Sequence, residues 1–450
     1  MPPRGGMDEG SVMTFREAEA YLYSFIGQRK LTDVYNTAGL LEFMKFLDHL
    51  GNPHQQLRSI LVAGTKGKGS TAAMLASMLH AAGLKVGLYT SPHLCSIRER
   101  IQVNGRHIEE ADFARLVSQL RAVYDAHGRP EVKRFRTFFE LLTALAFLHF
   151  VQERVDLAVL EVGLGGRLDA TNVVVPAVSI LTSISLDHVE ILGENLTLIA
   201  REKAGIIKNQ GIALSAPQVP EVDLVLQEMA ALQEARLYRV GQEFTWREEA
   251  CSVESTRFTF VGRRHRLQHL AIPLLGRHQI VNAVTALAAV ELLEEQGLAI
   301  TPAQIRQGLA QVRWEGRLEI VRRAPWVVLD GAHNQDSAEK LASAVQEIFP
   351  YSRLILILGV SANKNIQAIV QALAPLADLV ITTRAEVYRA ADPALIARYV
   401  SETSTPVRVI PTAREAVEEG LALTRQADML LITGSLYLIG EVKGFWESME

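Results

Sequence analysis

The chain has 450 residues, of which 48% are apolar and 21% charged, an ordinary composition for a globular protein, and its length predicts two domains. Its 46 basic side chains are nearly balanced by 50 acidic ones, so charge gives no reason to expect a nucleic acid or an anionic membrane as partner. The two cysteines, Cys95 and Cys251, are too few for a disulfide framework or a cysteine metal cluster and fit a reducing cytoplasm.

The first twelve residues, MPPRGGMDEGSV, have no apolar core of signal-peptide length. No uncharged apolar run in the chain approaches the length that spans a membrane. We therefore expect residues 1–12 to be a disordered tail, with Met13 as a candidate start, and the protein to be cytoplasmic. Helical periodicity then predicts helices over 14–27 and 37–51.

Short continuous apolar runs alternate with helical segments from residue 59 onward. Strands are predicted at 59–65, 85–91, 156–163 and 177–184, and helices at 70–83 and 138–151. Such runs are typical of strands buried on both faces, and the alternation predicts a largely parallel sheet covered by helices. Residues 234–275 instead alternate apolar and polar side chains, which predicts antiparallel hairpins at the edge of this domain.

Two helices, 277–297 and 301–312, close this first series, and Thr301 and Pro302 suit the start of the second one. A second series of strands follows at 326–334, 353–360, 378–383, 407–410 and 428–435. Helical stretches separate these strands, which is typical of a doubly wound, Rossmann-like α/β domain. We place the boundary near residue 313, giving domains at 13–312 and 313–450.

A glycine-rich turn follows the first predicted strand. Its glycines let backbone N–H groups close around phosphate oxygens, and the helix that starts near Lys68 adds its positive end. Lys68 supplies a cation for terminal phosphates, and Ser70 supplies a hydroxyl for phosphate or magnesium. The spacing departs from the standard G-x-x-x-x-G-K-[ST] pattern, and a structural turn is the alternative, but the flanking strand and helix favour phosphate binding. The residues predicted to bind ATP here are Gly64, Thr65, Gly67, Lys68, Gly69 and Ser70.

Polar clusters follow several predicted strands, at the edge where open parallel sheets bind ligands. They comprise Ser91, His93, Arg98 and Arg100; Glu161, Arg167, Asp169 and Asn172; Asp187 and His188; and, from a helical turn, Lys203 and Lys208. Taken singly, His188 could be a structural histidine, Glu161 a helix cap, and Arg98 and Arg100 part of a solvated face. Their expected convergence, with oxygen ligands that suit magnesium, favours a functional site.

The chain resembles the folylpolyglutamate synthase and dihydrofolate synthase family, within the Mur ligase superfamily of ATP-dependent carboxylate–amine ligases. The resemblance lies in the runs AGTKGKGS, TSPHLCSIRERIQVNG, TFFELLTALAF, EVGLGGRLDATN, SISLDHVEILG, IAREKAGIIK, GRHQIVNA, WEGRLE and LDGAHN. These runs span residues 62–334, and the C-terminal part is supported mainly by its α/β pattern. The resemblance implies a P-loop ATPase domain of Mur ligase type, mostly parallel with an antiparallel edge, followed by the Rossmann-like domain.

The resemblance also implies roles for single residues. The positions that match Ser91, Glu161 and His188 hold magnesium in the family, and the lysine that matches Lys203 is carbamylated. Lys68, Lys203 and His188 are therefore the implied catalytic residues. The implied nucleotide contacts outside the glycine-rich turn are Asn282, Arg317, Asp330 and His333. The implied folate-binding residues are Thr137, Phe138, Phe139, Glu140, Leu168, Asp169 and Ala170.

The implied reaction is an acyl transfer in two stages. The γ-carboxylate of a folate takes the γ-phosphate of ATP, and the amine of L-glutamate then attacks the acyl phosphate. Dihydropteroate would replace folate if the chain also has dihydrofolate synthase activity. The resemblance implies ATP and Mg²⁺, with two ions, as cofactors, a monovalent cation as a further candidate, a monomer, and neither nucleic acid nor membrane as partner.

The sequence departs from the family pattern at two places, and three alternative functions stay open. Lys66 stands where many relatives have asparagine. The run ANKN at 362–365, which contains Asn363, Lys364 and Asn365, stands where an Asp-Lys-Asp pattern is common. The alternatives are another ligase of the superfamily, a P-loop kinase or ATPase, and a non-catalytic nucleotide-binding regulator. The other ligases of the superfamily usually carry a further N-terminal domain, and only about 60 residues precede the glycine-rich turn here, too few for such a domain. A second α/β domain counts against the kinase.

Overall fold

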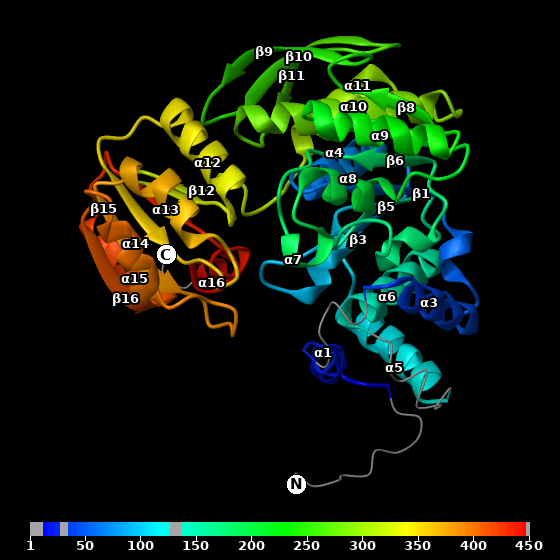
Figure 1. The fold of residues 1–450 in the computed structure, drawn as a ribbon, viewed down its shortest axis with the longest axis horizontal. Coiled ribbons are helices and arrows are strands. Elements are labelled where there is room, and N and C mark those ends of the chain that lie inside the picture. Colours follow the sequence, from blue (N-terminus) through cyan, green and yellow to red (C-terminus); the bar gives the residue numbers. More distant parts are fainter. Residues whose placement is uncertain (1–11, 28–34, 127–136, 447–450) are drawn as a thin grey trace, which may run out of the picture.

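The computed structural model describes residues 12–27, 35–126 and 137–446, which form two lobes (Figure 1). The blue-to-green lobe is the larger and N-terminal one, and the yellow-to-red lobe is C-terminal. Of the tail expected at 1–12, residues 1–11 lie outside the described residues. None of the helices in the described ranges combines the length and the apolar character that crossing a bilayer requires.

An eight-stranded sheet forms the middle of the N-terminal lobe, in the order β4-β3-β2-β5-β1-β6-β7-β8. Its strands are β1 (Ser59–Ala63), β2 (Val86–Tyr89), β3 (Ile101–Val103), β4 (Arg106–His107), β5 (Leu157–Glu161), β6 (Val178–Leu181), β7 (Ile212–Ser215) and β8 (Arg236–Arg239). β2, β5, β1, β6, β7 and β8 run parallel, whereas β3 and β4 form an antiparallel edge. β1, β2, β5 and β6 are buried along their whole length, as their apolar runs predict.

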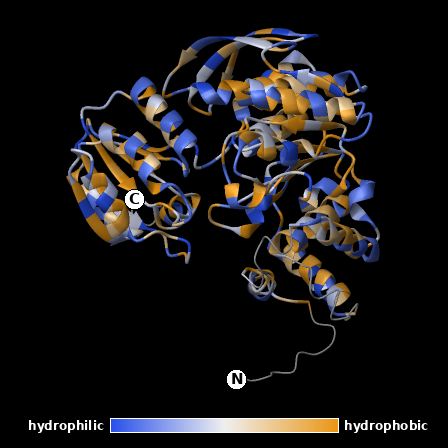
Figure 2. Cartoon of the chain, viewed as in Figure 1, coloured by the Kyte–Doolittle hydropathy of each residue, from blue (hydrophilic) through white to orange (hydrophobic). Residues whose placement is uncertain are grey.

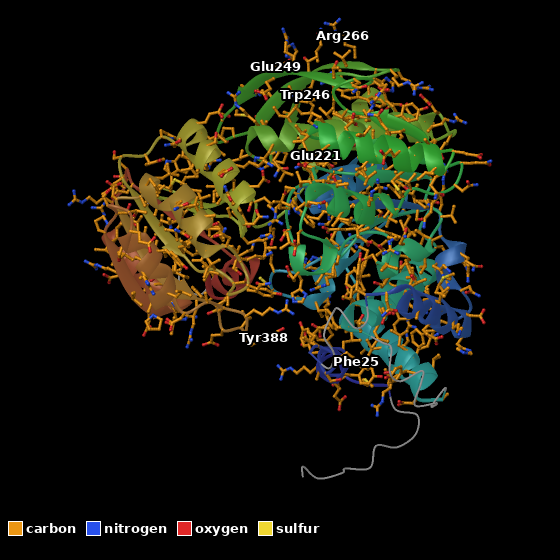
Figure 3. All side chains as sticks on the ribbon, in the orientation of Figure 1. Phe25, Glu221, Trp246, Glu249, Arg266 and Tyr388 are labelled. Atoms are coloured by element: carbon orange, nitrogen blue, oxygen red, sulfur yellow. The ribbon has the colours of Figure 1, made fainter. Side chains whose placement is uncertain are left out.

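The structure differs from the prediction for residues 234–275 in two respects. Arg236–Arg239 is not part of a hairpin but the parallel strand β8 beside β7. The antiparallel strands form a separate sheet, comprising β9 (Thr245–Cys251), β10 (Thr256–Val261) and β11 (Arg266–Ile272). In Figure 3 the labelled Glu249 and Arg266 lie on the outer side of this sheet. Its inner side packs on the lobe through buried phenylalanines of β10, and is therefore apolar.

Helices cover both faces of the large sheet. They are α1 (Phe15–Tyr23), α3 (Thr37–His49), α4 (Lys68–Ala81), α5 (Glu110–Ala126), α6 (Phe138–Gln152), α7 (Val189–Leu192), α8 (Leu196–Ala204), α9 (Pro220–Leu232), α10 (Arg277–Glu294) and α11 (Pro302–Gln311). Short 3-10 turns are η1 (Pro53–Gln56), η2 (Ile97–Arg100) and η3 (Ala170–Val173). The core on one face is formed with α4, α10 and α11, and the core on the other with α1, α3, α5, α6 and α8. Thr301 caps α11 and Pro302 begins it, as predicted.

The C-terminal lobe contains a six-stranded sheet in the order β12-β13-β17-β14-β15-β16. Its elements are β12 (Glu319–Arg323), β13 (Trp326–Leu329), α12 (Gln335–Ile348), β14 (Leu354–Leu358), α13 (Ile366–Leu373), η4 (Ala374–Leu376), β15 (Leu379–Arg384), α14 (Pro393–Ser401), β16 (Val407–Thr412), α15 (Ala413–Leu423), β17 (Met429–Thr433) and α16 (Leu436–Trp446). All strands except the edge strand β12 run parallel. α12, α13 and α14 cover one face and α15 and α16 the other, which confirms the doubly wound pattern. In Figure 2 the strands inside this lobe are mostly orange, that is, hydrophobic.

The two lobes meet through the loop that follows β2. Leu94 of this loop packs against the apolar cluster between the C-terminal sheet and α16. The backbone there is close, because a Cβ on Gly440 would lie 2.0 Å from the carbonyl oxygen of Leu94. The covalent connection runs between α11 and β12, and a boundary near residue 313 within it stays a prediction.

Candidate active site between the two lobes

A cavity of about 460 Å³ lies between the lobes, a volume in the range of ordinary small-molecule sites. It lies at the carboxyl ends of β1, β2, β5 and β6 and is closed on the other side by the segment after β13. It is lined by every residue that the sequence predicts for nucleotide, metal or catalysis, namely Gly64, Thr65, Gly67, Lys68, Gly69, Ser70, Ser91, Glu161, His188, Lys203, Asn282, Arg317, Asp330 and His333. The structure therefore brings these side chains together, although it does not assign their roles.

The glycine-rich turn leads into α4 with unsatisfied donors. Gly67 is the N-cap residue, with a left-handed backbone (φ 84°). The first main-chain hydrogen bond of the helix runs from the N–H of Thr71 to the carbonyl of Gly67, at 2.9 Å. The N–H groups of Lys68, Gly69 and Ser70 therefore have no helical acceptor, and the turn can receive an anion at the positive end of the helix.

The start of the turn is held by other bonds. The N–H groups of Thr65 and Lys66 both donate to the carbonyl of Ser183, at 2.8 and 3.1 Å. The Thr65 hydroxyl donates to the carbonyl of Ser185, at 3.0 Å. These groups fasten the turn to the end of β6, so phosphate would be received by the later N–H groups. A direct contact between Thr65 and ATP stays a prediction.

Close packing explains two of the glycines. A Cβ on Gly67 would lie 2.1 Å from Oδ1 of Asn282, and one on Gly69 would lie 2.4 Å from the ring of Trp314. Both distances are far below van der Waals contact. Asn282 of α10 and Trp314 of the interdomain connection therefore lie directly against the turn, and any side chain at these glycines would displace it.

Glu161 is a buried carboxylate at the end of β5. Its Oε2 accepts the N–H of Ser91 at 3.0 Å, and its Oε1 lies 3.9 Å from Nζ of Lys68. Burial raises the pKa of Glu161, and the nearby Lys68 ammonium opposes that rise. A buried carboxylate with one oxygen toward the cavity is a suitable ligand for a hard cation.

His188 completes the predicted magnesium ligands and follows β6. Its backbone is left-handed (φ 52°), and its side chain is 42% exposed. Burial is the largest influence on its pKa and lowers it, so the imidazole is neutral and able to ligate near pH 7. Across the described ranges, three or more His, Cys, Asp or Glu side chains nowhere gather into a metal site. Ser91, Glu161 and His188 offer a hydroxyl, a carboxylate and an imidazole to the cavity, and Mg²⁺ usually takes few protein ligands beside water and phosphate oxygens, so a magnesium site at these three residues stays a prediction.

Lys203 is a buried lysine on α8. Its Nζ donates to the carbonyl of Gly64, at 2.9 Å, and in the described part of the chain it has no carboxylate at ion-pair distance. Burial, followed by the neighbouring Lys68, lowers the pKa of Lys203 to about 7. Near neutral pH a large fraction of this amine is uncharged and nucleophilic, which is the form that carbamylation requires.

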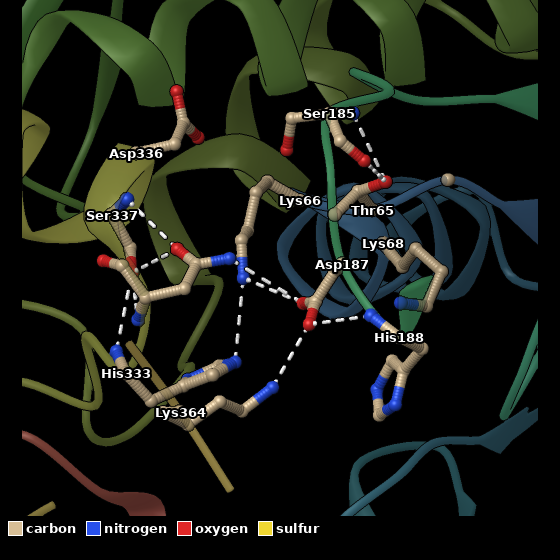
Figure 4. A network of polar contacts seen from close by, with 12 residues as sticks. Thr65, Lys66, Lys68, Ser185, Asp187, His188, His333, Asp336, Ser337 and Lys364 are labelled. Carbon is tan, nitrogen blue, oxygen red and sulfur yellow. Dashed lines mark hydrogen bonds and ion pairs between the residues drawn. The ribbon is translucent and has the colours of Figure 1, made fainter. Parts of the chain in front are cut away.

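Asp187 links the two lobes (Figure 4). Its Oδ1 accepts from Nζ of Lys364 at 2.8 Å, and its Oδ2 lies 3.4 Å from Nζ of Lys66. Burial opposes ionisation of Asp187, but Lys66 and Lys364 outweigh it and hold the pKa of this carboxyl well below its usual range. Lys364 belongs to the ANKN run, whose details the sequence left open. The lysine of that run pairs across the interface.

His333 lies in the same network from the C-terminal side. Its Nδ1 is 2.8 Å from the carbonyl of Gly331, and its Nε2 is 3.3 Å from Nζ of Lys66. A carbonyl only accepts and an ammonium only donates, so Nδ1 carries the proton and Nε2 is the acceptor. Burial, and then Lys66, lowers the pKa of His333 well below its usual value, which agrees with a neutral ring.

Arg317 lines the cavity from the connection between α11 and β12, and Asp330 lines it from the C-terminal lobe, directly after β13. Both carboxylate oxygens of Asp330 accept main-chain N–H groups, of Leu318 at 2.9 Å and Ala332 at 2.8 Å. Arg317 donates from Nη1 to the carbonyl of Gly316 at 2.9 Å. Asp330 therefore fixes the shape of this wall, and its contact with ribose stays a prediction.

The predicted folate residues lie beside the cavity and do not line it. Thr137 and Glu140 form a capping box at the start of α6, and the oxygens of Asp169 accept the N–H groups of Thr171 and Leu164. Their polar groups therefore hold loops in place. Phe139 reaches the cavity wall, because a Cβ on Gly163 would lie 2.5 Å from its ring. The contribution of this set to a folate pocket stays a prediction.

Other polar side chains from the same runs have structural partners. Arg167 pairs with Glu202 at 2.7 Å, and Lys208 donates to the carbonyl of Asn172 at 2.8 Å. Arg98 pairs with the carboxylate of Glu110 at 3.3 Å. The solvated or structural alternative therefore holds for these three cations.

The sequence interpretation missed several residues that line the cavity, namely His278, Gln279, Asp336, Ser337 and Lys340. Burial, followed by Lys340, lowers the pKa of His278 to about 4, so this ring is neutral. The signal was present for His278 and Gln279, which stand in the GRHQIVNA run. Lys340 and Asp336 lie on the first turns of α12 and carry no pattern that separates them from an ordinary ion pair.

Comparison with known families accounts for most of the chain. Residues 62–290 match the Mur ligase middle domain, and residues 316–436 match the Mur ligase, glutamate ligase domain. The first match ends within α10 and the second begins just before β12, so each match lies in one of the two lobes.

Individual relatives are similar over nearly their whole length. The folylpolyglutamate synthase of Lacticaseibacillus casei is 35% identical over 445 residues, covering 96% of this chain and 98% of the relative. The dihydrofolate synthase/folylpolyglutamate synthase of Bacillus subtilis is 34% identical, covering 90% and 94%. The structure of Mycobacterium tuberculosis folylpolyglutamate synthase complexed with ADP superimposes with a TM-score of 0.88 at 33% identity, covering 96% of this chain and 98% of that one.

Proposed function

The chain belongs to the Mur ligase family, and on that premise we propose that it is an ATP-dependent ligase that joins L-glutamate to the γ-carboxylate of a folate. The relatives that match it end to end carry the name folylpolyglutamate synthase. The observation that carries the proposal is the cavity between the lobes, since it unites a glycine-rich turn at a helix N-terminus, the buried carboxylate of Glu161 and the buried Lys203.

ATP would bind with its phosphates on the turn and its nucleoside toward the C-terminal lobe. The free N–H groups of Lys68, Gly69 and Ser70 and the Lys68 ammonium would hold the phosphates. Arg317 and His333 line the part of the cavity that would receive the nucleoside. ATP would thereby span the lobes, and the similar Mycobacterium tuberculosis enzyme complexed with ADP supports the binding of an adenine nucleotide.

A carboxylate of the folate would attack the γ-phosphorus, the bond between the β- and γ-phosphates would break, and ADP would be released. Two anions must approach, so Lys68 and the N–H groups of the turn are needed to offset their repulsion. Mg²⁺, when bound by Ser91, Glu161 and His188, would supply further positive charge at the phosphates. Carbamylated Lys203 would add an anionic oxygen donor to this set.

The resulting acyl phosphate is an activated carboxylate. The nitrogen of L-glutamate would attack its carbonyl carbon, the carbon–oxygen bond to phosphate would break, and inorganic phosphate would leave as the amide forms. Water would destroy this intermediate, so the lobes must stay closed on it. The Lys364–Asp187 contact between the lobes suits that requirement.

Dihydropteroate is a second acceptor that we propose for the same site. The Bacillus subtilis relative is named for both activities, and its similarity to this chain is almost as great as that of the relative named for one. Dihydropteroate presents a single carboxylate, which would take the place of the folate γ-carboxylate. We propose that the enzyme acts as a monomer in the cytoplasm.

The experiment that tests this function measures ADP release by the purified protein. ADP release should require ATP, L-glutamate and either tetrahydrofolate or dihydropteroate, and the product should gain the mass of one glutamyl residue. A kinase would release ADP without glutamate, and a regulator would release none. Either outcome would reject the ligase.

A further inference from the structure

Arg100 belongs to the loop segment that begins with the cavity-lining Ser91, but it does not itself line the cavity. It ends η2, and its carbonyl accepts the N–H of Thr90 at 3.0 Å, in the strand pair formed by β2 and β3. Ser91, the next residue after Thr90, lines the cavity and donates its N–H to Glu161. The backbone of Arg100 is therefore bonded to the residue that precedes the cavity-lining Ser91.

The groups that contact its guanidinium are neutral. Its Nε donates to Nδ1 of His93 at 2.9 Å, so this nitrogen is unprotonated. Burial, and then Arg100 itself, lowers the pKa of His93 to about 3, which keeps the ring uncharged. The guanidinium carbon lies 5.3 Å from the centre of the Phe138 ring, and Tyr23 stacks on that ring with 5.6 Å between the ring centres.

No carboxylate in the described ranges forms an ion pair with Arg100. Burial lowers the pKa of the Arg100 guanidinium. Arg98, two residues earlier in the same loop, shows the ordinary arrangement, since it pairs with Glu109 at 3.5 Å and with Glu110 at 3.3 Å. Arg100 is partly buried, and a guanidinium that loses water contacts without gaining an anion carries a desolvation cost that a bound anion would offset.

The C-terminal lobe faces this guanidinium as well. Tyr437 on α16 and Glu161 both lie close enough to influence the pKa of Arg100. The charge of Glu161 acts on the pKa of Arg100 without forming an ion pair with it, and a bound anion would supply the missing partner.

We propose that Arg100 binds a carboxylate of a glutamyl substrate beside the reacting carbonyl. The proposal rests on the proposed ligase function and deepens it. The planar guanidinium suits bidentate binding of a carboxylate, and the aromatic contacts hold it in place. The carboxylate comes either from incoming L-glutamate or from the terminal glutamate of the folate, because both carry one that does not react.

The test compares Arg100→Gln, Arg100→Lys and the matched control Arg98→Gln in the tetrahydrofolate reaction. Arg100→Gln should raise one KM by roughly 10- to 100-fold, the loss expected for a hydrogen bond to a charged group, while KM for ATP stays within about twofold. A rise in KM for L-glutamate assigns the carboxylate to the incoming amino acid, and a rise in KM for tetrahydrofolate assigns it to the tail. Arg100→Lys should recover part of the loss.

The proposal is overturned if Arg100→Gln leaves both KM values within twofold of the wild type, or changes them no more than Arg98→Gln does. A loss of kcat with unchanged KM values would also reject it. Thermal unfolding of each variant separates these outcomes from a folding defect. If the wild type makes no glutamyl product, the ligase function fails first, so the two failures are distinguishable.

Discussion

Asp187 of the N-terminal lobe and Lys364 of the C-terminal lobe form an ion pair with 2.8 Å between Oδ1 and Nζ. Both side chains are largely buried, at 13% and 15% exposure, and Lys66 approaches the other oxygen of the carboxylate. The pair lies at the edge of the cavity that both lobes line (Figure 4). It therefore joins the lobes where the proposed intermediate needs protection.

Asp187→Asn should weaken closure of the lobes. The substitution leaves two buried ammonium groups without their anion, a loss of about 3 kcal/mol for a buried pair, so kcat/KM for ATP should fall by roughly 150-fold. Glu190→Gln, at a neighbouring side chain that is 60% exposed, is the control and should change kcat/KM by less than about twofold. Equal effects of both variants would show that Asp187 does not hold the lobes together.

The fall of kcat/KM for ATP at alkaline pH should follow the deprotonation of Lys66. Burial, against the attraction of Asp187, lowers the pKa of Lys66 to about 8, so its charge and its attraction to Asp187 are lost as the pH rises through that value. We expect kcat/KM for ATP to fall over this range in the wild type and in the exposed-lysine control Lys45→Gln. Lys66→Gln should lack this fall.

The same titration affects stability with the opposite sign. The folded pKa of Lys66 lies below its ordinary value of 10.5, so between about 8 and 10.5 the unfolded chain binds more protons. This group alone therefore makes the free energy of unfolding rise with pH. A parallel fall of stability and activity would mean that global unfolding, and not Lys66, causes the fall of kcat/KM at alkaline pH.

Lys203→Ala should abolish most activity, and short-chain carboxylates should restore part of it. The expectation follows from carbamylation, since an added carboxylate can occupy the space of the carbamate. The carbamate itself can be observed by magnetic resonance after incubation with isotopically labelled bicarbonate. Lys208→Ala removes another buried lysine, whose pKa burial lowers to about 8, and should show no rescue. Full activity of Lys203→Ala would reject a functional carbamate at Lys203.

Gly67→Ala should impair ATP binding because its Cβ would lie 2.1 Å from Oδ1 of Asn282. KM for ATP should rise by roughly 5- to 150-fold, the effect of strain of about 1–3 kcal/mol at a ligand-binding loop. Gly83→Ala is the matched control, since Gly83 is also left-handed (φ 91°) but has nothing within 4 Å of an added Cβ. It should lower stability by about 1 kcal/mol and leave KM for ATP unchanged.

The elements that line the cavity were predictable because each depends on a local pattern. β1 and β5 are unbroken apolar runs buried on both faces, and the glycine-rich turn stands between a strand and a helix. By contrast, β3 and β4 are too short to show a period. β8 has polar neighbours on an edge, so its alternation predicted a hairpin although it pairs in parallel with β7.

Contacts between the lobes could not be predicted from the sequence. Asp187 and Lys364 are 177 residues apart, and only the packing of one lobe on the other brings them together. The ANKN run is visible in the sequence as a departure from the family pattern, but nothing in it predicts that Lys364 pairs with Asp187. Likewise, the unpaired state of Arg100 is visible only because the structure shows that Arg98 has acidic partners and Arg100 has none in the described ranges.

The central claim is that the substrate carboxylate becomes an acyl phosphate between the lobes. The most direct measurement uses tetrahydrofolate whose γ-carboxylate carries heavy oxygen, with ATP and L-glutamate in ordinary water. Mass spectrometry should then find one heavy oxygen in the inorganic phosphate and the other in the new amide. Unlabelled phosphate, with both heavy oxygens still on the folate, would contradict the account.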